Sequence, residues 1–159
     1  MTLEVPFGAL TLTSINNTYT GGTTIDADGT LRLGDGGTTG SVSGNITDNG
    51  TLLFRHSGTF LEAGAISGSG NVVQSGPGTT VLTASNTYSG GTFLAGGTLE
   101  AQIPGAIGSG AVTFLAGAPE TLRIAARRCR GIRSSTSQPA TRSISPISRP
   151  MPGATGASS

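Results

Sequence analysis

The chain of 159 residues is poor in charged and aromatic side chains, and it contains no tryptophan and no lysine. Charged residues make up 11% of the sequence, whereas an ordinary globular domain carries about 25%. So low a charge argues against disorder that is driven by self-repulsion. Aromatic residues make up only 4%, which argues against an ordinary large globular core.

Three further absences argue against a disulfide framework, a transmembrane helix and a signal peptide. The single cysteine, Cys129, cannot form an internal disulfide bond. No apolar stretch approaches the roughly 18 residues that a transmembrane helix needs. Residues 1–8 lack the basic and apolar regions of a signal peptide, so we expect no export of this polypeptide by that route.

Glycine is abundant, with 27 residues, and it separates short alternating runs of Thr, Ser, Leu, Val and Ile. Leu10 and Leu12, and again Leu31 and Leu33, alternate with polar residues, which is the period of a strand with one apolar face. Such runs recur about every 6–12 residues, a spacing typical of all-β architectures, and no helical period is visible. Further strands are predicted around Ile25, Ile46, Leu52, Phe54, Ile66, Val72, Val73, Val81, Leu82, Leu94, Leu99, Ile107 and Val112.

An internal repeat organises these strands. Residues 17–25 read Asn-Thr-Tyr-Thr-Gly-Gly-Thr-Thr-Ile, and residues 86–94 read Asn-Thr-Tyr-Ser-Gly-Gly-Thr-Phe-Leu. Gly-Thr-Leu follows both copies, and it occurs a third time at residues 50–52. The Asn-Thr-Tyr-Thr-Gly-Gly segment predicts a turn, since glycine and asparagine tolerate the positive φ that turns require.

A β-solenoid fits this pattern better than the other all-β folds. A sandwich usually has fewer glycines and more core aromatics, and collagen requires glycine at every third position. In a solenoid each coil stacks on the one before, so that like residues form ladders. With roughly 20 residues per coil, residues 1–125 would give about six coils and a rod about 30 Å long.

These residues resemble the autotransporter-associated β-strand repeat, also called the passenger-associated transport repeat. Residues 10–33 and 80–101 match the family pattern nearly throughout, and residues 46–82 resemble the spacer between two copies. The resemblance covers about residues 8–118. It implies a right-handed parallel β-helix that belongs to the passenger domain of a type V secreted autotransporter. It also implies display at the bacterial outer membrane or cell surface, or extracellular release, and a role in passenger folding and transport.

The resemblance implies partners as well as a fold. Such passengers are joined to their own outer-membrane β-barrel translocator, which this sequence lacks, so we expect a passenger fragment, a mis-started gene model or a degenerate copy. The family carries no catalytic residues, and we expect no catalytic, cofactor-binding or metal site. Strand edges exposed at both ends of a solenoid predict self-association.

The composition changes after residue 125. Eight acidic residues and only three arginines precede this point, whereas six arginines, Cys129 and four prolines follow it. Residues 126–159 are too polar to cover a core and are predicted to be a disordered basic tail. One hypothesis is that this tail is translated out of frame, and the other is that it binds a membrane or nucleic acid. The tail lacks aromatics for base stacking, so we expect no nucleic-acid partner.

Several residues could belong to a binding or catalytic site, but a purely structural role is favoured for each. Gly68-Ser-Gly70 and Gly108-Ser-Gly110 lack the rest of a nucleotide-binding loop and are predicted to be turns. Asp26, Asp28 and Asp35 lack calcium-loop spacing and are predicted to be solvated turn carboxylates. His56 has no nucleophile at a recognisable spacing, and we expect it at the edge of a coil.

The polar residues of the motif were weighed in the same way. Tyr19 and Tyr88 occupy equivalent positions, and we expect them to pack on a neighbouring coil rather than to bind a sugar. Asn16, Asn45 and Asn49 fit glycosylation sequons but are interpreted as turn residues.

Three functions remain open at this point. The first is a non-catalytic structural stalk, and the second is an adhesin, which should show exposed aromatics or insertions on one face. The third is the remnant of a pectate-lyase-like β-helix enzyme, which would need clustered carboxylates with Lys or Arg on successive coils. The dispersed acids and the absence of lysine favour the stalk, with no small-molecule substrate.

Overall fold

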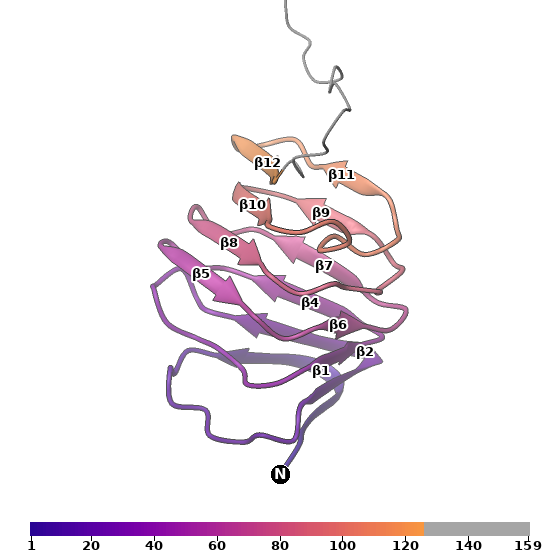
Figure 1. Cartoon of the computed structure of the whole chain (residues 1–159). Coiled ribbons are helices and arrows are strands. Elements are labelled where there is room, and N and C mark those ends of the chain that lie inside the picture. Colours follow the sequence, from indigo (N-terminus) through magenta and orange to yellow (C-terminus); the bar gives the residue numbers. More distant parts are fainter. Residues whose placement is uncertain (126–159) are drawn as a thin grey trace, which may run out of the picture. The chain divides into compact units, whose positions relative to one another are not determined.

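The computed structural model describes residues 1–125, which form twelve β-strands and, within this range, no helix (Figure 1). Eight strands belong to one sheet, namely β1 (Leu3–Leu12), β2 (Thr23–Leu33), β3 (Ile46–Asp48), β4 (Thr51–Phe54), β6 (Ile66–Ser67), β7 (Asn71–Gln74), β9 (Thr92–Leu94) and β11 (Val112–Phe114). Four strands belong to the second sheet, namely β5 (Thr59–Glu62), β8 (Thr79–Leu82), β10 (Gly97–Ala101) and β12 (Glu120–Ile124).

All strand pairs are parallel, and each strand pairs with one that lies about a coil away in the sequence. Thr51 pairs with Asn71 and Thr59 with Thr79, so one coil takes 20 residues in the middle of the stack. The long strand β2 serves two faces, because residues 23–25 pair with β3 and residues 30–33 pair with β4. The chain therefore winds as a parallel β-solenoid of about six turns.

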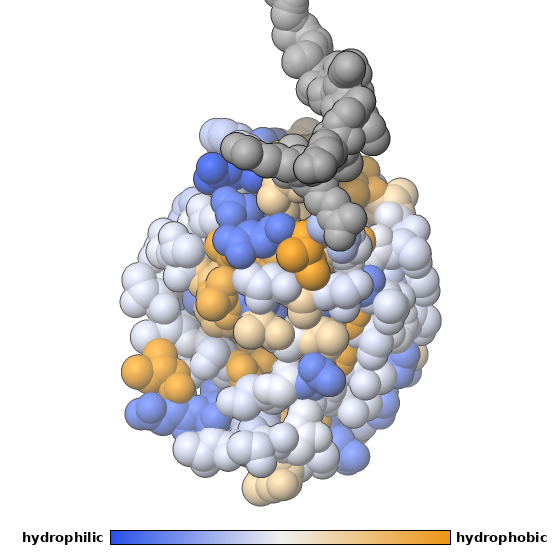
Figure 2. All heavy atoms as spheres, in the orientation of Figure 1, coloured by the Kyte–Doolittle hydropathy of each residue, from blue (hydrophilic) through white to orange (hydrophobic). Residues whose placement is uncertain are grey.

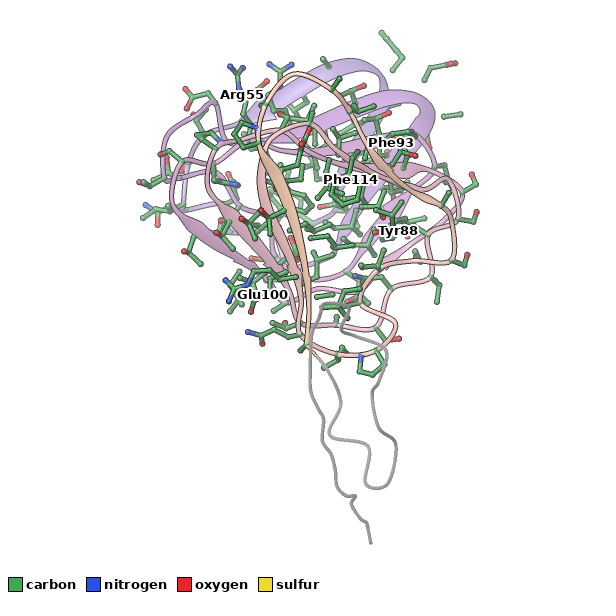
Figure 3. All side chains as sticks on the ribbon, turned by 90° about the horizontal axis from the view of Figure 1, so that it is seen from above. Arg55, Tyr88, Phe93, Glu100 and Phe114 are labelled. Carbon is green, nitrogen blue, oxygen red and sulfur yellow. The ribbon has the colours of Figure 1, made fainter. Side chains whose placement is uncertain are left out.

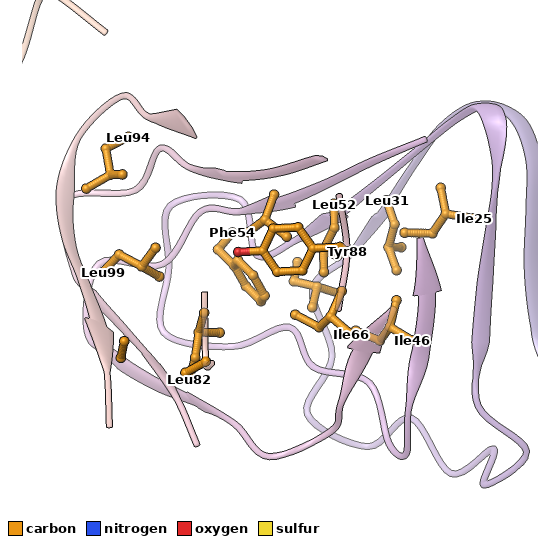
Figure 4. Packing of buried hydrophobic residues seen from close by; sticks show 14 of the residues in the cluster. Ile25, Leu31, Ile46, Leu52, Phe54, Ile66, Leu82, Tyr88, Leu94 and Leu99 are labelled. Carbon is orange, nitrogen blue, oxygen red and sulfur yellow. The ribbon is translucent and has the colours of Figure 1, made fainter. Parts of the chain in front are cut away.

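Inward-facing side chains form continuous ladders along the stack. One ladder runs through Leu10, Leu31, Leu52, Val72, Thr92 and Val112, and the next through Leu12, Leu33, Phe54, Gln74, Leu94 and Phe114. Most side chains of these ladders, together with those of Ile25, Ile46, Ile66, Leu82 and Leu99, meet in one buried core (Figure 4). Val112 and Phe114, at the end of the ladders, are exposed. Seen from above, the coils superimpose around this filled interior (Figure 3).

Glycines at three turns allow the coils to approach closely. A Cβ atom at Gly64, Gly78 or Gly108 would lie 2.1 Å from the carbonyl oxygen of the residue one coil earlier. Real Cβ atoms do not approach an oxygen so closely, so only glycine fits these positions without a backbone shift. The abundance of glycine follows from stacking as much as from turn conformation.

The prediction of an all-β, parallel β-helix with coils of about 20 residues is confirmed. One predicted strand is wrong: Ile107 lies in a turn, although its side chain packs against the core. Pro104 removes a backbone donor and Gly105 has a φ of +83°, and both features interrupt a strand there. The predicted disordered tail of residues 126–159, with Cys129 and its arginines, lies outside the described residues.

On the face shown in Figure 2, most of the surface is of intermediate or hydrophilic character, and hydrophobic residues occur in separate patches. No helix that could span a bilayer occurs in the part of the chain that the structure describes.

Candidate functional site

The repeated motif is the strongest candidate for a functional element, and its second copy begins with a buried asparagine. The Oδ1 atom of Asn86 accepts a hydrogen bond of 2.7 Å from the backbone amide of Ile66, one coil earlier. Its Nδ2 atom donates to the carbonyl of Ala106, one coil later. Asn86 therefore joins three successive coils at a corner where no strand ladder does so.

The tyrosine of this copy packs on the interior side of the same corner. Tyr88 is 0% exposed and points into the coil interior (Figure 3). Its hydroxyl lies 2.7 Å from the hydroxyl of Thr92, which is also buried. Burial raises the pKa of Tyr88, so the phenol stays protonated and can keep this hydrogen bond. The prediction that Tyr88 packs within the stack is confirmed.

The first copy of the motif makes different contacts. The Nδ2 atom of Asn17 donates to the carbonyls of Ser14 and Ser41. The Tyr19 side chain is only partly buried, and neither its hydroxyl nor that of Thr23 has a hydrogen-bond partner. Burial raises the pKa of Tyr19, and the nearby Thr23 hydroxyl, which lies outside hydrogen-bond geometry, opposes this rise in part.

The glycine and asparagine positions act as turn and stacking elements, as predicted. The Asn45 side chain accepts a hydrogen bond of 3.0 Å from the amide of Ala65, and Asn49 accepts one of 3.2 Å from the amide of Ser69. Asn16 is exposed, and its backbone amide bonds the hydroxyl of Ser14. Gly68-Ser-Gly70 and Gly108-Ser-Gly110 lie at the corners where one coil packs on the next.

The acidic residues fall into two groups. Asp26, Asp28 and Asp35 are exposed, as predicted, although the first two lie within β2 rather than in a turn. Sequence reasoning missed Asp48 and Glu62, which point into the solenoid interior and are buried. The alternation of side chains along a strand could have revealed them. Asp48 lies two residues after the inward-facing Ile46, and Glu62 lies two residues after Phe60.

The two buried carboxyls share one arrangement. The Oδ1 atom of Asp48 accepts from the amide of Gly50 at 3.0 Å, and the Oε1 atom of Glu62 accepts from the amide of Gly64 at 2.9 Å. The second oxygen of each carboxyl has no hydrogen-bond partner. Burial raises the pKa of Asp48 to about 7, against the opposing effect of the Gly50 and Leu52 amides. Burial likewise raises the pKa of Glu62 to about 7.

The prediction that His56 lies at the edge of a coil is wrong. The side chain is 1% exposed, and its Nε2 atom lies 2.8 Å from the carbonyl oxygen of Gly40. Its ring stacks on that of Phe60, with centroids 4.2 Å apart. Gly34 leaves space for the ring, since a Cβ atom there would lie 3.0 Å from Cδ2 and Nε2 of His56, whereas Gly76 packs on the His56 backbone. Sequence alone could not reveal this pocket, because its walls come from three coils.

Metal-ligating side chains and ion pairs are sparse in the part of the chain that the structure describes. Within residues 1–125, no group of three or more His, Cys, Asp or Glu residues could hold a metal ion. Stacking does place an arginine beside a glutamate on successive coils, since the Nη1 atom of Arg123 lies 3.3 Å from the Oε2 atom of Glu100. This pair is a surface ion pair between β10 and β12. A hollow of about 370 Å³ on the first coils is lined by hydroxyl, amide and backbone groups of Thr20, Gly21, Gly22, Thr23, Thr24, Gly44, Asn45 and Thr47.

Comparisons with known proteins agree with this picture. The model of the passenger-associated-transport-repeat family matches residues 8–33 and 72–101. The chain is 43% identical over 104 residues to the adhesin BmaC autotransporter of Brucella suis biovar 1 (strain 1330). This match covers 65% of the chain but only 3% of the much longer relative. No solved structure is significantly similar to the chain. Residues 8–33 and 72–101 therefore match two passenger-associated transport repeats, and the chain is similar to a short part of an autotransporter adhesin.

Proposed function

We propose that the chain is a non-catalytic stalk segment of an autotransporter passenger, which folds by coil stacking and holds more distal parts of the passenger away from the cell. It would be displayed at the outer membrane or cell surface, or released from there, in association with its own β-barrel translocator. The similarity to an autotransporter adhesin supports this placement.

One observation carries the stalk role. The polar side chains of the motif, which could have formed a site, serve packing instead: Asn86 joins three coils, and Tyr88 bonds Thr92 of its own coil in the interior. A segment whose distinctive residues serve stacking is suited to transmit order from one coil to the next. Such a segment would aid passenger folding without touching a ligand.

A display assay tests this proposal. The chain would be placed between a signal sequence and a translocator barrel, with an epitope tag at its distal end, and surface tag and protease resistance would be measured. We expect strong surface signal and a protease-resistant passenger, both reduced in Asn86→Ala because it leaves backbone groups of two coils unpaired. Equal display of a sequence-scrambled chain would contradict the stalk role.

An adhesin function is the second candidate, and one feature of the flank favours it. Leu53, Val73 and Phe93 form an outward-facing ladder on β4, β7 and β9, and each is only partly buried. Apolar side chains in an outward ladder can contact a partner surface. Binding of the labelled chain to extracellular-matrix proteins would be measured for the wild type and for Phe93→Ser. Equal or absent binding in both would reject this function.

Self-association through the solenoid ends belongs to the same proposal. Phe114 continues the ladder of the fully buried Leu94, yet it is 54% exposed on the last described coil. Open strand edges with apolar side chains favour pairing between chains. Sedimentation at tens of micromolar should therefore reveal species larger than the monomer, and Phe114→Ser should reduce them. A single monomer boundary for the wild type would contradict self-association through the solenoid ends.

A further inference from the structure

One coil of the solenoid differs from the others in its buried ionisable groups. Residues 46–65 contain Asp48, His56 and Glu62, all of which are buried. Among the described residues, the other buried polar side chains are those of threonine, glutamine, asparagine and tyrosine. This stretch, which we call the acidic coil, therefore places two carboxyls in an interior that is otherwise neutral.

Asp48 is enclosed from several directions by neutral groups. Its strand partner in β2 is Ile25, and the backbone of Gly70 packs so closely that a Cβ there would lie 2.5 Å from Oδ1. The titratable group that interacts with it is the phenol of Tyr88, whose pKa the Asp48 charge raises. No counter-charge therefore offsets ionisation of Asp48.

Glu62 is in the same situation at another corner of the coil. Its strand partner in β8 is Leu82, and the backbone of Gly64 lies against its carboxyl group. The third ionisable group of the coil, His56, is occupied with the Gly40 carbonyl and the Phe60 ring and bonds neither carboxyl. Ionisation leaves each carboxylate with one backbone donor and one orphan oxygen.

We propose that the acidic coil is a pH-sensitive layer of the solenoid, closed while Asp48 and Glu62 are protonated and opening ahead of its neighbours when they ionise. An unpaired carboxylate in a dry interior costs several kcal/mol, and a coil can open locally because it contacts only its two neighbours. The proposal is independent of the display role, since it concerns the stability of the coil alone.

The direction of the pH effect follows from proton binding. Each carboxyl has a folded-state pKa of about 7, above the ordinary values of 3.8 for Asp48 and 4.5 for Glu62. Between about pH 4 and pH 7 the folded chain therefore holds protons that the unfolded chain has released. Stability is full below this window, falls as the pH rises through it, and levels off above it.

Two measurements on the full-length chain test the proposal. Urea unfolding from pH 4 to pH 8.5 gives the unfolding equilibrium constant, which should rise with pH by roughly several hundredfold for each carboxyl. Hydrogen exchange measured by mass spectrometry, corrected for intrinsic rates, locates the opening. Residues 46–65 should lose protection at a lower pH than residues 71–101.

Matched variants separate burial from charge. Asp48→Asn and Glu62→Gln should each remove the part of the pH dependence of stability that the substituted carboxyl contributes. Asp35→Asn is the control, because Asp35 also bonds the amide two residues later, that of Gly37 at 3.3 Å, but is exposed. A flat wild-type profile, an Asp35→Asn effect as large as that of Asp48→Asn, or uniform loss of protection would overturn the proposal. If a variant fails to fold, the wild-type profile and its exchange pattern still decide the question.

Discussion

At the scale of the residue, the tyrosine of the repeat motif has a different environment in each copy. Tyr88 is enclosed by coils on both sides and has Thr92 within hydrogen-bond distance. Tyr19 lies in the first coils, is less buried, and keeps an unpartnered hydroxyl. The same residue type in the same motif therefore contributes differently to stability, because the neighbouring coils differ.

The first prediction compares these two positions. Tyr88→Phe should lower the free energy of unfolding by about 1 kcal/mol or more, since it leaves the buried Thr92 hydroxyl without a partner. Tyr19→Phe should change it by less than about 0.5 kcal/mol, because no hydrogen bond is lost. Urea unfolding at pH 5, where the acidic coil is closed, measures both. Equal losses in the two variants would show that the Tyr88–Thr92 bond contributes little.

At the scale of the element, short strands are held in register by the turns between them. Strands of two to five residues form most of the stack, so their pairing depends on how closely the corners approach. Gly78 packs on the carbonyl of Gly58, whereas a Cβ at Gly58 would meet only the Thr38 methyl group at 3.4 Å. Two glycines one coil apart therefore have unequal steric freedom.

The second prediction uses this pair. Gly78→Ala should destabilise the chain by about 1–3 kcal/mol, because β8 must shift away from β5 to relieve the contact. Gly58→Ala should be neutral or stabilising by up to about 1 kcal/mol, since it restricts the unfolded chain without a clash. Thermal unfolding of the two variants, side by side, checks the expectation. A tolerated Gly78→Ala would mean that the corner can relax freely.

At the scale of the whole molecule, the described coils form a one-dimensional stack. The coils contact one another through the eight-stranded sheet and, from β5 onward, through the four-stranded sheet as well. Their buried hydrophobic side chains pack into one cluster (Figure 4). In such a molecule stability is approximately a sum of coil and interface contributions, so damage stays local. This is also why the acidic coil can respond to pH without unfolding the remainder.

The third prediction concerns this locality. Leu94→Ala removes a fully buried side chain from β9 and should cost about 2–5 kcal/mol. Hydrogen exchange should increase most in residues 71–114, which form the coils on either side, and least in residues 23–33. A uniform increase along the chain would indicate a single cooperative unit instead.

Much of the fold follows from local signals. Alternation at Leu31 and Leu33, the paired glycines of the motif and the repeat itself predicted strands, turns and a coil of about 20 residues. A strand was wrongly predicted at Ile107 because this isolated apolar residue was given more weight than the neighbouring Pro104 and Gly105. The assignment of His56 to a coil edge failed because the glycines that contact its ring, Gly34 and Gly40, lie on another coil.

The sequence by itself determined the period of the solenoid, the residue types of its ladders and its resemblance to the repeat family, since these depend on patterns along the chain. Only the tertiary structure decided that His56 lies inside, that one oxygen of Asp48 and of Glu62 has no partner, and that Asn86 joins three coils. The physical reason is that every coil is packed against residues about 20 positions away. Burial, hydrogen bonding and pKa depend on those distant neighbours, which no local pattern specifies.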